Sequence, residues 1–276
     1  MANNAVLLVI RILAGIGAIM LILSPSILMH RIHKQKRVGV ASVLPLVMLL
    51  ANSHLWTVYG CLSENWFPVF SCFVIGDFAA LAYIAVYWRH TTDPHYVGRV
   101  FSAIAAVLAI ITIYAIVGGL GYAGQTRSAV ASTVGYIGDV TAILLYASPM
   151  EKLFQVLKHK SAAFINVHMV VASLSSNCMW FTYGLLTDNW IILAPNILFV
   201  TLNSFTLVLY LVFNPTAHPL PASFFASNDG NDAGIEVTVE MSPKVGTGSK
   251  SYSVPSPEYK PMQSPLVPLS LQLDQS

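Results

Sequence analysis

Two tryptophans and one asparagine have the chemistry and the spacing to hold a polar solute inside an apolar protein. Trp56 and Trp180 stand in the matching segments WTVYG and WFTYG, each about five residues before an apolar run ends. If these runs are helices, both tryptophan rings lie about 7–8 Å from the end of their helix. Asn196 lies at nearly the same depth in the helix that follows Trp180. Aromatic faces stack on the C–H surfaces of a carbohydrate and an amide bonds its hydroxyls, which predicts a binding cavity. The alternative is ordinary helix packing, with an interhelical hydrogen bond from Asn196.

Two acidic residues, Asp77 and Asp139, fall near the centres of apolar runs. An ionisable side chain inside a membrane is costly and is by default a functional candidate. We expect each to be a proton site, an ion site or a neutral hydrogen-bonded residue. The sequence shows no metal-ligand spacing, no cofactor motif and no nucleophile beside a base, so we predict no metal, no cofactor and no enzymatic activity.

Three prolines lie where bends would be useful. Pro25 and Pro149 are near one end of their apolar runs, and Pro45 is near the start of another. A proline inside a helix removes a backbone hydrogen bond and makes a bend point, which would suit a gate. The alternative, slightly favoured by position alone, is that Pro25 and Pro149 end helices and Pro45 begins one.

These side chains need long apolar helices to position them. The chain is 55% hydrophobic and 9% charged, with a mean hydropathy of +0.67, far from the composition of a soluble protein or a nucleic-acid binder. Apolar runs of about 20 residues without alternation predict membrane-spanning helices. We predict seven of them, at 5–28, 41–61, 66–88, 98–122, 128–150, 163–186 and 190–213.

An internal repeat organises the seven helices. Residues 24–87 recur without a gap as 148–211, at an offset of 124 positions, and the matched residues include Trp56 with Trp180. A repeat at a fixed spacing reports architecture. After three spans the chain is on the opposite side of the membrane, so a second three-helix unit that followed at once would have the inverted orientation. The single extra helix brings the chain back, so that both units have the same orientation. We therefore predict an all-α membrane protein of two parallel three-helix bundles joined by a linker helix (3+1+3).

Charge in the short loops predicts the orientation. The loops after the first, third and fifth spans hold nine lysines and arginines, whereas those after the second, fourth and sixth hold only Arg127. Positive loops stay in the cytoplasm. We expect an integral protein of the plasma membrane with its N-terminus outside and its C-terminus in the cytoplasm.

Four regions follow from the spans. They are a first bundle at 1–88, a linker with the fourth helix at 89–127, a second bundle at 128–213 and a tail at 214–276. The tail is rich in proline and serine and has too little apolar surface to offset the entropy of ordering. We predict a disordered cytoplasmic segment that leaves room for cytosolic partners.

Several of these motifs resemble those of a known family. Ser24-Pro25, WTVYG, Ser148-Pro149, WFTYG and Ala194-Pro195-Asn196, in this order and spacing, resemble the SWEET (MtN3/saliva) sugar transporters over about residues 5–213. The resemblance implies a uniporter that moves sugars by rocking two three-helix bundles.

The resemblance also assigns roles to residues. It implies a substrate pocket lined by Trp56, Trp180 and Asn196, with Asn52 and Ser176 one turn earlier. It implies an inner gate at the prolines and an outer gate near two tyrosines. The gate positions are Pro25, Pro45, Pro149, Tyr59 and Tyr183.

The chain departs from the family pattern in two places. The pocket asparagine that would pair with Asn196 falls on Cys72, whose thiol is a weaker hydrogen-bonding group. The fourth gate proline is missing, since residues 162–172 contain none. Both departures put the identity of the sugar in doubt more than the fold.

We therefore predict facilitated transport of mono- or disaccharides across a membrane by alternating access. The alternative is a proton-coupled PQ-loop-type transporter of an amino acid or another small solute, with Asp77 or Asp139 as its proton site. A seven-helix receptor or scaffold is a third class, which the duplicated core disfavours. The sequence leaves a homo-oligomer open.

Overall fold

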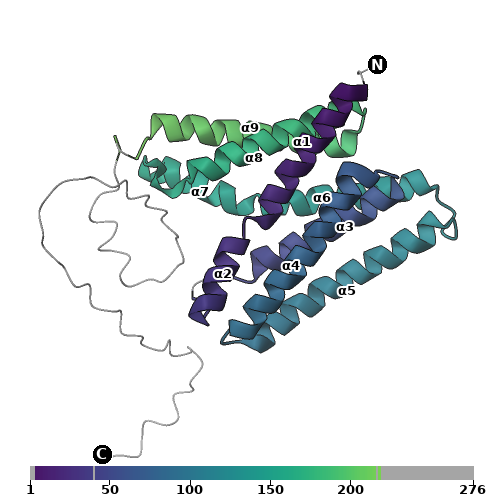
Figure 1. Cartoon of the computed structure of the whole chain (residues 1–276), viewed down its shortest axis with the longest axis horizontal. Helices are drawn as coiled ribbons and strands as arrows, with labels where there is room; N and C mark the ends of the chain where they lie inside the picture. Colours follow the sequence, from purple (N-terminus) through teal and green to yellow (C-terminus); the bar gives the residue numbers. More distant parts are fainter. Residues whose placement is uncertain (1–3, 40, 216, 219–276) are drawn as a thin grey trace, which may run out of the picture. The chain divides into compact units, whose positions relative to one another are not determined.

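The computed structural model describes residues 4–39, 41–215 and 217–218, and it places them in helices (Figure 1). The chain divides into two units, 1–239 and 240–276, and all described residues belong to the first. Most of the predicted tail, 219–276, lies outside the described residues. In chain order the elements are α1 (Asn4–Leu23), α2 (Ser26–Gln35), α3 (Leu44–Leu62), the short helix η1 (Trp66–Phe70), α4 (Ser71–His90), α5 (Pro94–Gly119), α6 (Arg127–Leu145), α7 (Ala147–His159), the short helix η2 (Ala162–Phe164), α8 (Val167–Leu186) and α9 (Trp190–Val212).

Within the described part of the chain, five helical segments are long and apolar enough to cross a membrane: α1 with α2, η1 with α4, α5, α6 and α9. Large apolar side chains on them have no protein cover, such as Phe78, which is 70% exposed, and Ile110, which is 67% exposed. Helices α3 and α8 coincide with predicted spans two and six and have 19 and 20 residues, but they are not among these five. Three of their polar residues, Ser53, Ser176 and Asn177, are buried. The arrangement fits the predicted 3+1+3 pattern.

The repeat is visible in the backbone as well as in the sequence. Among the described residues, four other than glycine have positive φ, and they form two pairs at the repeat offset. Lys36 (φ 59°) and Lys160 (φ 52°) end α2 and α7, while Glu64 (φ 56°) and Asp188 (φ 49°) follow α3 and α8. Matching strained turns at matching positions mean that the two halves share one backbone design.

Predicted spans one and five are each broken into two helices. The first breaks at Ser24–Pro25, where Pro25 precedes the first residue of α2, and the fifth breaks at Tyr146, between α6 and α7. Pro45 is the second residue of α3, a position where the missing N–H costs nothing. Pro149 is the third residue of α7, and its side chain lies outside the described part of the structure. Pro25 and Pro45 thus mark helix boundaries, as the second interpretation of the prolines predicts.

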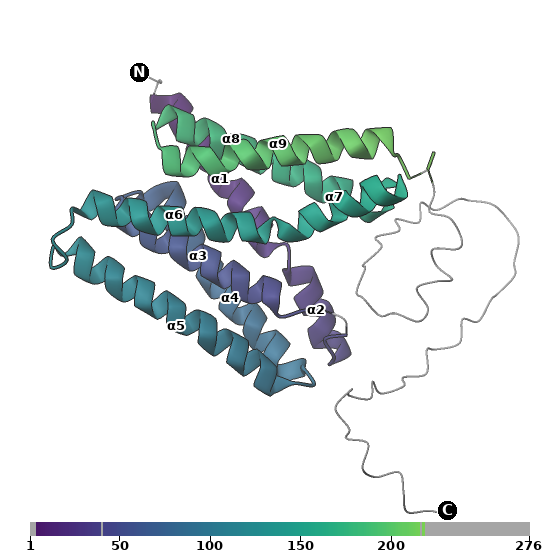
Figure 2. The same ribbon diagram turned by 180° about the vertical axis from the view of Figure 1, so that it is seen from behind.

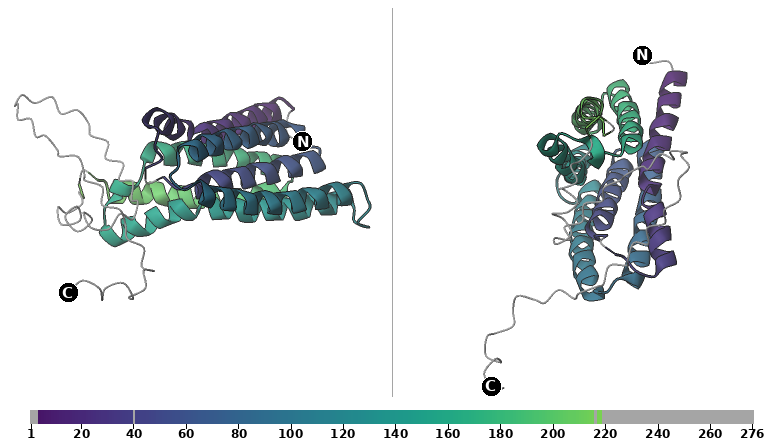
Figure 3. Two further views of the ribbon diagram at one scale, coloured as in Figure 1. Left: turned by 90° about the horizontal axis from the view of Figure 1, so that it is seen from below. Right: turned by 90° about the vertical axis from the view of Figure 1, so that its left-hand side faces the viewer.

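The helices pack in two equivalent groups. In the first half α4 lies between α1 and α3, and in the second half α9 lies between α6 and α8. The halves meet through two equivalent contacts, α1 with α8 and α3 with α6 (Figures 1 and 2). Helix α5 packs against α3 and α6 at the edge of this group (Figure 2). In the left-hand view of Figure 3 the helices of both halves lie roughly side by side.

The glycines of WTVYG and WFTYG allow close helix contacts. A Cβ added to Gly60 would lie 2.7 Å from the backbone nitrogen of Phe70, and one added to Gly184 would lie 2.9 Å from that of Leu193. Backbone cannot move aside as a flexible side chain can. Because both positions are glycine, α3 can lie close to the start of α4, and α8 can lie close to α9.

Candidate functional site

A cavity of about 210 Å³ lies between the two halves. Helices α1, α3 and α4 of the first half and α6, α8 and α9 of the second half all contribute to its wall, whereas the wall takes no residue from α5. Ten of the lining residues form five pairs at the repeat offset. The pairs are Ala18 with Ala142, Leu21 with Leu145, Ile22 with Tyr146, Asn52 with Ser176, and Trp56 with Trp180. Equivalent residues of the two halves therefore line the cavity from both sides.

Three aromatic rings form one wall of this cavity. Phe73 of α4 lies between the two tryptophans, with its ring centroid 5.9 Å from that of Trp56 and 6.0 Å from that of Trp180. The Phe73 and Trp56 rings are stacked, with 25° between their planes. Both tryptophans are more than nine-tenths buried. This row of rings offers a flat apolar surface of the kind that the C–H face of a sugar ring needs.

Polar atoms complete the wall, and two of them lack a partner. Asn52 Oδ1 and Ser176 Oγ are buried without a hydrogen bond. Asn196 donates from Nδ2 to the carbonyl of Ile192 at 2.7 Å, which leaves its Oδ1 to serve as an acceptor in the cavity. A buried polar atom without a partner costs about 1–3 kcal/mol. A ligand rich in hydroxyls would remove that cost.

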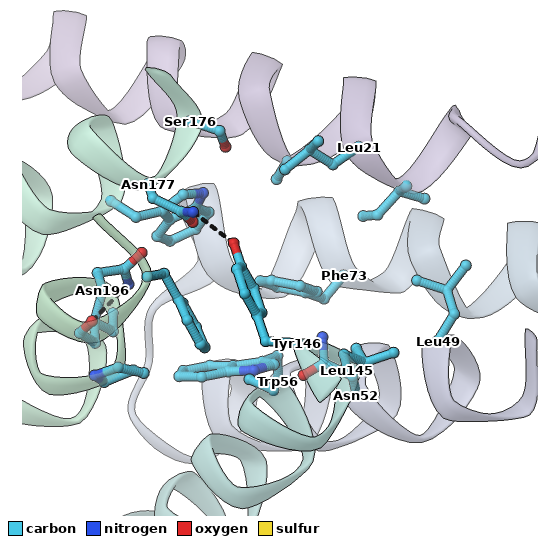
Figure 4. Close-up of a pocket in the computed structure, with 17 residues that line it drawn as sticks. Leu21, Leu49, Asn52, Trp56, Phe73, Leu145, Tyr146, Ser176, Asn177 and Asn196 are labelled. Atoms are coloured by element: carbon cyan, nitrogen blue, oxygen red, sulfur yellow. Dashed lines mark hydrogen bonds between the residues drawn. The ribbon is translucent and has the colours of Figure 1, made fainter. Parts of the chain in front are cut away.

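Tyr146 makes the second-half side of the cavity more polar than the first-half side. Its hydroxyl accepts a hydrogen bond from Asn177 Nδ2 at 2.6 Å and lies 3.1 Å from Ser173 Oγ (Figure 4). Its ring stacks on Phe199, with centroids 3.9 Å apart. The repeat equivalent of Tyr146 is Ile22. The cavity is thus pseudosymmetric in its tryptophans and asymmetric in its hydroxyls.

Two equivalent hydrogen bonds join the halves beyond the tryptophans. Asn189 of the second half donates from Nδ2 to the hydroxyl of Tyr59 at 2.8 Å, and Asn65 of the first half donates to the hydroxyl of Tyr183 at 2.8 Å. Both tyrosines are almost fully buried. We call the end of the helices that holds these four residues the tyrosine end. It is closed by contacts between the halves.

An arginine contacts one of these tyrosines. The guanidinium carbon of Arg11 lies 5.9 Å from the ring centroid of Tyr183, within the range of a cation–π interaction. The equivalent residue in the second half is Gly135, where an added Cβ would lie 3.0 Å from the Tyr59 ring. One tyrosine is therefore covered by a cation and the other by backbone.

Asp77 is hydrogen-bonded away from the cavity wall. Thr112 of α5 donates its only hydroxyl proton to the carbonyl of Leu108, so His54 Nε2 donates to Thr112 Oγ1 across their 2.9 Å contact. One proton then lies between His54 Nδ1 and Asp77 Oδ2, which are 3.3 Å apart. Asp77 Oδ1 is buried without a partner.

Asp139 lies on α6, and one of its oxygens, Oδ1, is also buried without a partner. Neither Asp77 nor Asp139 is among the residues that line the cavity. Among the described residues there is no group of three or more histidines, cysteines or acids that could hold a metal ion.

Residues 8–95 and again 132–218 match the model of the sugar efflux transporters for intercellular exchange, the MtN3/saliva family. The protein belongs to this family. The two matched segments begin 124 positions apart, which is the offset of the internal repeat. The unit that the family model describes is thus present twice in the chain.

Individual relatives agree with this assignment. The bidirectional sugar transporter SWEET3b of Oryza sativa subsp. japonica is 28% identical over 219 residues, covering 77% of this chain and 85% of that protein. The sugar transporter SWEET1 of Dictyostelium discoideum is 27% identical over 219 residues, covering 77% of this chain and 96% of that protein. The solved structure of a eukaryotic SWEET transporter superposes with a TM-score of 0.66 at 21% identity, covering 75% of this chain and 96% of that one, and it shows the shared fold.

Most of the predicted pocket residues of this MtN3/saliva protein come together in the structure. Trp56, Trp180, Asn52, Ser176 and Asn196 all line the central cavity. Their role in binding stays a prediction, as does the gating role of the prolines and tyrosines.

Cys72 is the exception. It is buried and its thiol points toward the carbonyl of Gly15, 3.8 Å away, so it does not line the cavity as predicted. The next residue, Phe73, lines it instead. Successive residues of a helix point about 100° apart, which is enough to turn one of them out of the wall.

Sequence reasoning also missed Tyr146 and Asn177, which line the cavity. The repeat carries no signal for them, because their equivalents are Ile22 and Ser53. Asn65 and Asn189 did carry a signal, since the same residue type recurs at the same distance from each tyrosine. The signal did not reveal that each asparagine bonds the tyrosine of the other half.

Proposed function

We propose that this protein is a facilitative transporter of mono- or disaccharides that works by alternating access. The observation that carries the proposal is the cavity between two equivalent halves, with an aromatic wall and unpartnered polar atoms at Asn52 and Ser176. Membership of a sugar efflux family, with relatives named bidirectional sugar transporters, supplies the substrate class.

The aromatic and the polar parts of the cavity wall bind different parts of the sugar. The sugar's C–H face lies against the row formed by Trp56, Phe73 and Trp180, and its hydroxyls bond Asn52, Ser176 and Asn196. The volume of about 210 Å³ is below the range of about 300–1,000 Å³ for sites of drug-sized ligands, which favours a monosaccharide.

The translocation step follows from where the halves are joined. At the tyrosine end the halves are held by the two tyrosine–asparagine hydrogen bonds and by the hydrogen bonds of Arg127 on α6 to the end of α3. In contrast, α2 packs on α4 of its own half and α7 packs on η2 of its own half. A cavity closed at one end by breakable contacts can open there when the halves rock. We place the tyrosine end outside the cell, in the plasma membrane, with the N-terminus outside and the C-terminus in the cytoplasm. A homo-oligomer and cytosolic partners of residues 214–276 stay predictions.

The second candidate is proton-coupled transport of another small solute. The unpartnered oxygens of Asp77 and Asp139 favour it, because a buried acid is a natural proton carrier. Against it, Asp77 shares its proton with His54 outside the cavity wall, where a bound solute does not touch the pair.

Purified full-length protein in liposomes tests the proposal. Labelled glucose or sucrose should equilibrate across the membrane without a proton gradient, and Trp180→Ala or Asn196→Ala should abolish the flux. Trp190→Ala is the matched control, because Trp190 is 70% exposed and lies outside the cavity wall. No flux with any common sugar would sink the proposal, and sugar-driven proton movement would favour the second candidate.

A further inference from the structure

A second cavity, of about 350 Å³, opens at the tyrosine end. Its wall comes from three elements: the last turn of α3 with the residues that follow it, the first turns of α6, and Ile191 of α9. Two features make it a neighbour of the central cavity. Tyr59 lines the second cavity while its ring touches Trp56 of the central one edge-on, at 5.4 Å between centroids. Ile191 lines the second cavity while the next residue, Ile192, lines the first.

We propose that this second cavity is an entry site, where a sugar is bound by its hydroxyls before the tyrosine end opens. The proposal rests on the proposed sugar transport and adds a binding site to it. The ligand class is an uncharged, hydroxyl-rich solute.

The wall contains a fixed ion pair that suits such a ligand. Arg127 donates from Nη1 to Glu64 Oε1 at 3.0 Å, and it is held in place by two further bonds to carbonyls at the end of α3. These two bonds go to Leu62 at 2.9 Å and to Cys61 at 2.8 Å. A guanidinium beside a carboxylate offers donors and acceptors together, and each sugar hydroxyl is both. Because the arginine is already ordered, little side-chain entropy is lost when a ligand binds.

Hydroxyl and apolar groups complete the wall. Ser128 and Ser132 present hydroxyl groups from one face of α6, and Leu62 and Ile191 present apolar surface. Five of the nine lining residues are serines or charged residues, a composition that suits a ligand rich in hydroxyls. The volume also falls in the range of about 300–1,000 Å³ that such sites have.

The equivalent positions on the other side of the pseudosymmetric fold differ in their side chains. At the repeat offset, Ser132 corresponds to Leu8, which is 54% exposed, and Ala131 corresponds to Leu7. At this position α1 therefore carries an exposed leucine where α6 carries a serine hydroxyl, whereas Ser128 corresponds to Asn4, which is also polar. The wall of serines and charged residues lies on the approach between α3 and α6.

A ligand in the second cavity affects a contact that closes the tyrosine end. Tyr59 forms part of the wall, and its hydroxyl accepts the 2.8 Å bond from Asn189 that joins the halves. A sugar hydroxyl that reaches Tyr59 competes with Asn189 for it. Occupation of the entry site then weakens the contact that must break for the sugar to pass.

The first test fills the cavity. Ser132→Phe should raise the KM for sugar entry from the tyrosine side about tenfold, which corresponds to about 1.4 kcal/mol, and should leave equilibrium exchange at saturating sugar unchanged. Thr133→Phe is the matched control, because Thr133 also bonds the carbonyl four residues earlier but lies outside this wall and is exposed. Equal KM values for the two variants would overturn the entry site.

The second test does not depend on transport. Ser128→Cys, in a chain whose Cys61, Cys72 and Cys178 are replaced, should react with a membrane-impermeant thiol reagent, and glucose should slow the reaction several-fold. The protection should persist when Trp180→Ala is added, since that change removes binding in the central cavity only. Protection that is absent, or that disappears with Trp180→Ala, contradicts a separate site.

The two tests separate the entry site from the proposed function. Wild-type flux together with unchanged KM and no protection rejects the entry site and keeps sugar transport. Persistent protection without any wild-type flux keeps a sugar site and rejects transport.

Discussion

Asn189 Nδ2 lies 2.8 Å from the hydroxyl of Tyr59, and the repeat reproduces this contact with the halves exchanged, as Asn65 Nδ2 at 2.8 Å from the hydroxyl of Tyr183. Each tyrosine is thus held by the asparagine of the other half. Because the two bonds are equivalent, we expect any rocking of one half against the other to stretch both together.

Removing one of these bonds should shift the protein toward opening at the tyrosine end. Asn189→Ala loses a bond worth about 1 kcal/mol, so the open population should rise about fivefold. The measurement is the rate at which an impermeant thiol reagent, added from the tyrosine side, modifies Ser176→Cys in a background without the native cysteines.

Asn166→Ala is the matched control for that change. Asn189 accepts a hydrogen bond from the backbone N–H of Ile192 at the start of α9, and Asn166 accepts one from Met169 at the start of α8. Both variants lose a helix cap, but only Asn189→Ala loses a bond between the halves. Equal labelling rates in the two variants would show that the Tyr59 bond does not hold this end closed.

The glycines of the two repeated segments should be intolerant of a methyl group. Gly60→Ala and Gly184→Ala each place a Cβ within 2.9 Å of backbone, so each should destabilise the protein by about 1–3 kcal/mol through overpacking. Thermal unfolding in detergent should show a lower midpoint for both. In Gly98→Ala the nearest atom would be 3.4 Å away, an ordinary contact, so this variant should match the wild type.

Phe73 should contribute to sugar affinity although it lacks polar atoms. Its ring lies between those of Trp56 and Trp180, and loss of an aromatic contact costs about 0.5–1.5 kcal/mol beyond buried area. Phe73→Ala should therefore raise the KM for glucose flux several-fold. Phe78→Ala, on the same helix but 70% exposed, should leave the KM unchanged, and the same KM for both variants would remove Phe73 from the binding surface.

Asp77 should be replaceable by asparagine but not by leucine. In Asp77→Asn the amide can donate to His54 Nδ1 in place of the shared proton, so flux and stability should be kept. Asp77→Leu leaves His54 without this partner and should lower stability by about 1–3 kcal/mol. Liposome uptake with an internal pH dye measures the flux, and thermal unfolding in detergent measures the stability. A substrate-driven pH change that Asp77→Asn abolishes would support proton coupling instead.

The length, apolarity and repetition of segments can be read directly along the chain. The features that follow from these three properties were therefore determined by the sequence alone. Apolar length located the seven helical regions, and the fixed offset paired Trp56 with Trp180 at one depth. The resemblance added Asn52 and Ser176, which line the cavity. Helix breaks at Pro25 and near Pro149 could also be foreseen, because proline acts on its own helix.

The direction in which each side chain points, and the partner it meets, depended on how the helices pack. Cys72 and Phe73 are neighbours in sequence, but only the rotation of α4 against α1 and α3 decided that the ring faces the cavity and the thiol faces Gly15. Likewise, each half contains a tyrosine and an asparagine at the same spacing. The pairing of Tyr59 with Asn189 arises because the tyrosine end brings the halves together, a contact between residues 130 positions apart that local sequence does not encode.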